Sequence, residues 1–175
     1  MKTPLILALA ASLLAAPARA EVVDRSAAGF EVRETATIAA PQAAVYAAFL
    51  APGRWWSSAH SWSGDAKNLS IDLAKGCLCE TLPNGGFVRH LALIYADGSQ
   101  LRFEGAMGPL VFTGASGHLI VAFKDDGGRT AMTLTYALGG YAKGGLAETL
   151  AGPVDGMLTE QVGRFKRYVE TGKPE

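Results

Sequence analysis

A single long amphipathic stripe follows a series of short strand-like segments, and this order limits the folds open to the chain. Between residues 146 and 169, apolar residues recur every three or four positions, which predicts a helix with one apolar face. Gly152-Pro153 interrupts the stripe, so the pattern allows a short helix followed by a long one, or one helix kinked at Pro153. Such a helix must bury its apolar face against another layer.

The preceding part of the chain predicts that layer. A half-buried strand is expected at 30–38 and a short Ala-rich helix at 43–50, ended by Pro52-Gly53. Further strand-like segments follow at 69–73, 77–82, 87–95, 100–105, 118–124 and 130–138. Tight turn signals between them favour antiparallel pairing. The expected fold is α+β: a curved antiparallel sheet of about six to seven strands packed on a long C-terminal helix, with short helices after the first strand.

The first twenty residues have the layout of a secretory signal peptide. Lys2 precedes an apolar run at 5–16, and Ala18-Arg19-Ala20 is a small-x-small cleavage site. The apolar run is shorter than the roughly 20 residues that a membrane span needs. We therefore expect cleavage after Ala20, a single domain at 21–175, and a periplasmic or secreted protein.

Charge argues against several classes of partner. Residues 21–175 hold 14 basic and 16 acidic residues, a net charge of −2, with no polybasic cluster. Nucleic acid and anionic membrane surfaces are therefore not expected partners. No Gly-x-x-x-x-Gly-Lys-Ser/Thr loop is present to hold phosphates, so ATP binding is not expected. No cofactor is expected either.

All three tryptophans fall within eight residues, together with one of the three histidines. The segment contains Trp55, Trp56, His60 and Trp62 among several serines. One interpretation is that one of the adjacent residues Trp55 and Trp56 caps the core while the other packs on the surface. The other is that Trp56, His60 and Trp62 line the mouth of a pocket, because aromatic walls with a few polar groups suit small-molecule sites.

Cys77 and Cys79 occupy alternate positions of one predicted strand, so both point to one face. A turn centred on Asn84-Gly85 would place Glu80 opposite Arg89, and Cys79 opposite His90. Three interpretations follow: two free apolar cysteines, a disulfide that requires local distortion, or a metal site for Zn(II) or Cu(I) formed with His90. The cysteines of an extended strand lie about 6.5–7 Å apart between Cα atoms, at or beyond the disulfide range.

With these features the chain resembles the SRPBCC, or START-like, superfamily, and within it the group related to polyketide cyclases and Aha-type chaperone-ATPase activators. The resemblance rests on the segments 36–41, 45–49, 55–56, 76–80, 105–110 and 164–169. It implies a helix-grip fold, in which a sheet wraps around the long helix and leaves an apolar cavity between them. Members bind lipids, sterols, polyketides and other apolar molecules, and some catalyse cyclisation.

Three functions remain open. The first is an exported protein that holds an apolar or amphipathic molecule in this cavity. The second is a cyclase- or dehydratase-like enzyme that uses His60 or His90 for proton transfer. The third is a metal- or redox-responsive protein. A serine hydrolase is not expected, because no Gly-x-Ser-x-Gly elbow is present. The candidate ligand-binding residues are Trp55, Trp56, His60, Trp62, Cys77, Cys79 and His90.

Overall fold

The computed structural model describes residues 19–175 and has an α+β architecture. Its eight strands are β1 (Arg19–Ser26), β2 (Gly29–Ile38), β3 (Leu69–Asp72), β4 (Cys77–Thr81), β5 (Phe87–Ala96), β6 (Gln100–Glu104), β7 (Gly114–Asp126) and β8 (Arg129–Tyr141). Its two α-helices are α1 (Gln42–Phe49) and α2 (Leu146–Thr171). Four short 3₁₀ helices are η1 (Pro52–Arg54), η2 (Ser58–His60), η3 (Ala66–Asn68) and η4 (Gly108–Phe112).

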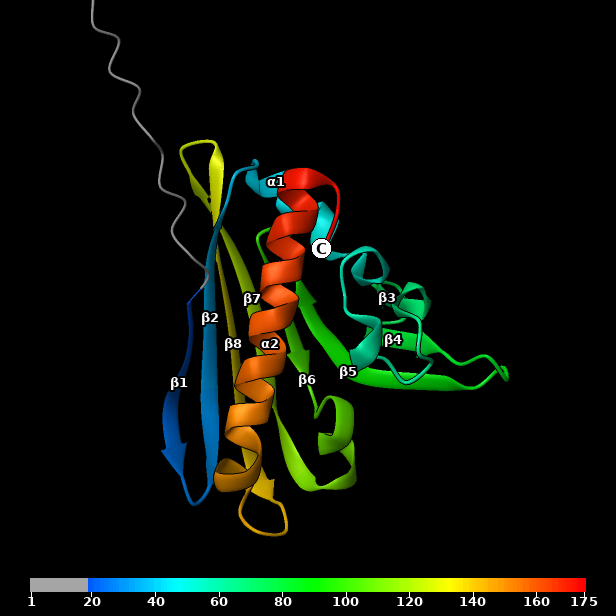
Figure 1. Cartoon of the computed structure of the whole chain (residues 1–175), viewed down its shortest axis with the longest axis vertical. Coiled ribbons are helices and arrows are strands. Elements are labelled where there is room, and N and C mark those ends of the chain that lie inside the picture. Colours follow the sequence, from blue (N-terminus) through cyan, green and yellow to red (C-terminus); the bar gives the residue numbers. More distant parts are fainter. Residues whose placement is uncertain (1–18) are drawn as a thin grey trace, which may run out of the picture.

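All eight strands form one antiparallel sheet in the order β1-β2-β8-β7-β6-β5-β4-β3. After the β1–β2 hairpin, the chain passes through α1 and the 3₁₀ helices to the opposite edge. It then returns strand by strand until β8 pairs with β2. The helix α2 packs mainly against β2 and β1. Figure 1 shows β1 and β2 to the left of α2, while the β3–β5 region extends away on the right.

The strand count is higher than expected because β1 was missed. This edge strand pairs only with β2, its described side chains are largely exposed, and its pairing is irregular between Val22 and Asp24. Without one buried face it shows no clear alternation of apolar and polar residues. The predicted signal peptide lies outside the described residues, except that Arg19 and Ala20 begin β1 opposite Thr35 and Glu34.

The C-terminal stripe forms one continuous helix, α2, which runs through Pro153. Proline has no N–H to donate within the helix, but the apolar face on both sides of it is buried and holds the two halves together. The buried positions of α2 are Leu146, Ala147, Ala151, Val154, Leu158, Gln161, Val162 and Phe165. They pack on the inner face of the sheet, where the core lies.

Candidate functional site

The tryptophan segment divides between core and cavity. Trp55 is only 2% exposed, and its ring packs 5.1 Å from that of Phe49 and 5.0 Å from that of Phe165. Trp56 and Trp62 instead line a cavity. Both sequence interpretations therefore hold in part, but Trp55 is a core residue and does not line the main cavity, contrary to its place among the candidate ligand-binding residues.

The cavity has a volume of about 570 Å³ and lies between α2, the tryptophan segment, η4 and the inner face of the sheet. Its wall is mainly apolar, with a few polar side chains. The lining residues are Trp56, Ala59, His60, Ser61, Trp62, Leu69, Leu78, His90, Met107, Gly108, Pro109, Leu110, Tyr136, Leu150, Pro153, Val154 and Met157. A volume of this size is typical of small-molecule sites.

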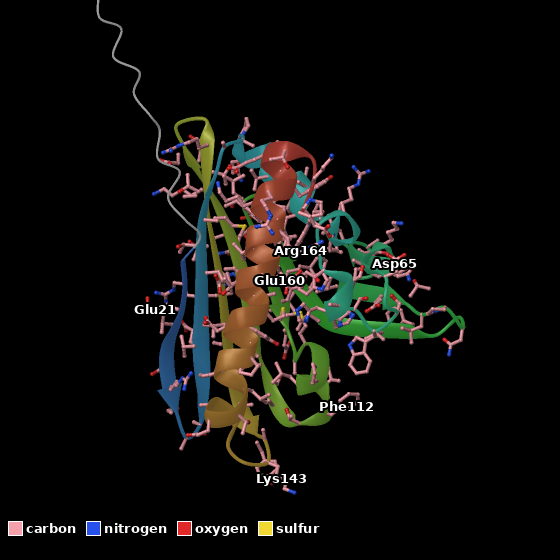
Figure 2. The ribbon with its side chains drawn as sticks, viewed as in Figure 1. Glu21, Asp65, Phe112, Lys143, Glu160 and Arg164 are labelled. Atoms are coloured by element: carbon pink, nitrogen blue, oxygen red, sulfur yellow. A yellow bond between two sulfur atoms is a disulfide. The ribbon has the colours of Figure 1, made fainter. Side chains whose placement is uncertain are left out.

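Two exposed aromatic rings lie at the rim of the cavity. Trp62 is 44% exposed and Phe112 is 75% exposed, and their rings meet edge to face at 5.3 Å. Figure 2 shows Phe112 projecting from the η4 segment at the surface of the molecule. The edge-to-face pair joins two segments far apart in the sequence, the tryptophan segment and η4, so both contribute to the rim.

His60 lines the cavity and is paired with α2. Its Nε2 lies 3.0 Å from a carboxylate oxygen of Glu160, which Figure 2 labels on that helix. Both side chains are partly exposed. Partial burial raises the pKa of Glu160, but hydrogen bonds from Ser57 and His60 outweigh it, so the pKa lies below its ordinary value. The carboxylate is therefore the charged form near neutral pH.

His90 lies deeper, in a pair that is almost wholly buried. Its Nε2 is 2.8 Å from Oε2 of Glu80, and the side chains are 5% and 0% exposed. The same carboxylate accepts backbone N–H groups from Trp62 at 3.1 Å and Ser63 at 2.6 Å. Burial raises the pKa of Glu80, but these donors together hold the pKa below its ordinary value. A buried carboxylate thus ties the tryptophan segment to the cavity histidine.

Tyr136 adds a second buried polar group to the wall. Its hydroxyl accepts from the Met107 N–H and donates to the Gly105 carbonyl, both at 3.1 Å. Burial raises the pKa of this hydroxyl far above its ordinary value, despite the hydrogen bond from Met107. The neutral tyrosine fixes the backbone that leads into η4, and so positions Met107 and Leu110 on the cavity wall.

The predicted patch of Cys77, Cys79 and His90 does not form. β4 and β5 pair with Cys79 opposite Arg89 and Glu80 opposite Val88, one residue away from the predicted register. The turn closes between Leu82 and Gly86 rather than symmetrically about Asn84-Gly85. A one-residue slip moves side chains to the other face, so Cys79 and His90 lie on opposite faces of the sheet. The predicted Glu80–Arg89 pair is likewise wrong.

Cys77 and Cys79 form a disulfide, the second of the three interpretations, and neither lines the cavity. Their Cα atoms are 5.4 Å apart, closer than in an extended strand, and the pairing of β4 with β5 is irregular between Leu78 and Cys79. The bulge supplies the distortion that the bridge requires. Within residues 21–175, no three His, Cys, Asp or Glu side chains converge as a metal site would need.

The sequence pattern also missed a carboxyl group buried beneath α2, that of Glu34, which lies close to Asp155 of the helix. Glu34 on β2 is fully buried, and neither its Oε2 nor Oδ1 of Asp155 has a hydrogen-bond partner in the described part of the chain. Thr159 Oγ1 lies 3.1 Å from the other Glu34 oxygen. Burial raises the pKa of Glu34 to about 7; the Thr159 hydrogen bond opposes this rise and the nearby Asp155 adds to it.

No helix among residues 19–175 is both long and apolar enough to cross a membrane. The sequence matches no protein-family model, and no match is found among curated proteins.

Solved structures share the architecture at low sequence identity. A conserved protein of unknown function, EF2215 from Enterococcus faecalis, is 13% identical with a TM-score of 0.60, over 89% of this chain and 78% of that one. A protein from Arthrobacter aurescens is 17% identical with a TM-score of 0.53, over 85% and 92%. CalU16 from Micromonospora echinospora is 15% identical with a TM-score of 0.50, over 85% and 84%. These similarities establish a shared fold.

Proposed function

We propose that this chain binds an apolar or amphipathic small molecule in the cavity between α2 and the sheet. The observation that carries the proposal is the cavity itself: about 570 Å³, walled mainly by apolar side chains, with aromatic rings at its rim. Filling such a space with a ligand removes apolar surface from water, which is the main source of affinity in sites of this kind.

The family and location form part of the same proposal. The single long helix against a curved antiparallel sheet supports membership of the START-like, or SRPBCC, superfamily with its helix-grip arrangement. The signal-peptide pattern of residues 1–20 supports export to the periplasm or beyond. N-terminal sequencing of the protein from a cell-envelope fraction tests export, and a mature chain that begins at Glu21 is the expected result.

Binding is tested first by native mass spectrometry of freshly purified protein, which reports a co-purified organic molecule. The second test is tryptophan fluorescence during titration with fatty acids, sterols and polycyclic aromatic compounds. Trp56 and Trp62 line the cavity and Trp55 does not, so a Trp56→Phe, Trp62→Phe double variant should lose most of the response. A response that survives in the double variant would place the binding site elsewhere.

A matched pair of substitutions on α2 tests the location of the site directly. Met157 lines the cavity and is half-buried, so Met157→Trp should fill part of the space without overpacking the closed core. Met157→Leu keeps the volume and serves as control. We expect Met157→Trp to weaken binding at least tenfold, while Met157→Leu stays within about twofold. Equal affinity for both variants argues against the cavity as the site.

The pairing of His90 with Glu80 favours a second candidate function, proton transfer on the bound molecule. A histidine oriented by a carboxylate beside an apolar cavity has the arrangement of a general acid–base. Once a ligand is identified, exchange of its acidic C–H hydrogens in heavy water can be followed by mass spectrometry. Exchange that wild type accelerates and His90→Phe does not supports the enzyme; exchange at the buffer rate excludes it.

A further inference from the structure

Most side-chain hydrogen-bond donors of the cavity wall already have acceptors within the protein. Trp56 Nε1 donates to the His60 carbonyl at 3.0 Å, and the Ser61 hydroxyl donates to the Ser58 carbonyl at 2.8 Å. The Tyr136 hydroxyl donates to the Gly105 carbonyl. Each of these lining side chains has already directed its donor at the protein. Among the cavity-lining indole and hydroxyl groups, Trp62 Nε1 alone has no acceptor among the described residues, and it lies at the exposed rim, so the interior offers a ligand few free donors.

His90, in contrast, offers a free hydrogen-bond acceptor to the cavity. Because Glu80 also accepts two backbone N–H groups and is held as a carboxylate, it can only accept from the imidazole, so Nε2 of His90 carries the hydrogen. In the neutral ring, Nδ1 is then an acceptor. Nδ1 has no hydrogen-bond partner among the described residues, and it is not completely buried. Since His90 lines the cavity, its remaining exposed surface opens there.

Charge also determines which polar group of a ligand can lie next to His90. Glu80 already places one negative charge beside His90 in a buried setting. A ligand carboxylate would bring a second negative charge into a mainly apolar space, at a high desolvation cost. A hydroxyl adds no charge and supplies the missing donor.

We infer that the cavity selects a neutral molecule with an apolar body and one hydroxyl group, which donates its hydrogen to Nδ1 of His90. This inference rests on the proposed binding function and names the ligand class for it. Glu80 acts as a positioning residue, because it sets which ring nitrogen faces the ligand.

Three matched probes of one ring system test the inference: 2-naphthol, 2-methoxynaphthalene and 2-naphthoate. The methyl ether keeps the oxygen but has no hydrogen to donate, and the naphthoate carries the charge. Calorimetric titration should show 2-naphthol binding about fivefold or more tightly than the ether, as one neutral hydrogen bond allows. The naphthoate should bind more weakly than 2-naphthol. His90→Phe should remove the preference for 2-naphthol, and the control Leu73→Ala, at an exposed turn residue, should keep it.

Nitrogen-15 NMR of the histidine rings provides a readout that needs no variant. The Nδ1 resonance of His90 should move on addition of 2-naphthol and stay in place with the ether. The inference is overturned if wild type binds 2-naphthol and the ether equally, or prefers the naphthoate. It is also overturned, while the proposed function stands, if fatty acids bind but neither the three probes nor sterols do. If no compound of either set binds, both fail.

Discussion

Nε2 of His90 lies 2.8 Å from Oε2 of Glu80, although the two residues are on different strands and were expected on different faces of the sheet. The same carboxylate holds the backbone N–H groups of Trp62 and Ser63. A single buried side chain therefore connects the cavity histidine, the rim tryptophan and the disulfide-bearing strand β4.

Removing Glu80 should be costly for stability. Glu80→Ala leaves two backbone N–H groups and the His90 ring without their acceptor in a buried site, so we expect a loss of about 3 kcal/mol or more in the free energy of unfolding. Glu80→Gln retains one acceptor oxygen and should lose less. Urea unfolding at neutral pH measures both. A loss under about 1 kcal/mol for Glu80→Ala would contradict this account of the carboxylate.

Glu34 should make stability depend on pH. Its pKa is raised from 4.5 to about 7 in the folded protein, so the folded state holds the proton more tightly than the unfolded state. This contribution is fully present below about pH 4.5 and is lost as the pH rises through about 7. The change from pH 4.5 to pH 8 should be on the order of 3 kcal/mol. Glu34→Gln, which stays neutral, should lack it. Urea unfolding of both proteins across this range should give curves that diverge as pH rises, and parallel curves would refute the prediction.

The Cys77–Cys79 disulfide should add little to stability. It closes a loop of only three residues, and the entropic gain of a cross-link grows with loop length, so replacing both cysteines by serine should cost about 1–2 kcal/mol. Intact mass after alkylation without reductant should show no labelled thiol in wild type. Two labelled thiols in protein isolated from the cell envelope would show that the bridge does not form there.

Tyr136→Phe should affect the cavity more than the core. The ring remains, but the Met107 N–H and the Gly105 carbonyl lose their partner next to η4. We expect a loss of about 1–3 kcal/mol in stability and weaker ligand binding, because Met107 and Leu110 line the cavity. Thermal unfolding and fluorescence titration measure the two effects. Unchanged ligand affinity together with lowered stability would limit Tyr136 to a structural role.

Much of the fold follows from periodicity. The strand segments from β2 to β8 and the apolar stripe of α2 were predicted because a buried face imposes a period of two or of about 3.6 on the sequence. β1 was not predicted, because an exposed edge strand has no buried face to impose such a period. The interpretation that Trp56, His60 and Trp62 line a pocket agrees with the structure, in which all three line the cavity.

The tertiary structure determined the register of β4 on β5 and which tryptophan is buried, neither of which periodicity can predict. The register of β4 on β5 depends on the turn and the bulge at Leu78–Cys79, and a slip of one residue places Glu80, not Cys79, beside His90. The division between Trp55 and Trp56 depends on Phe49, six residues before Trp55, and on Phe165 of α2, 110 residues after it, because both rings pack against Trp55 in the core. Local sequence determines which faces are apolar; contacts between distant segments determine which polar groups meet, because those contacts exist only when the sheet and α2 are assembled.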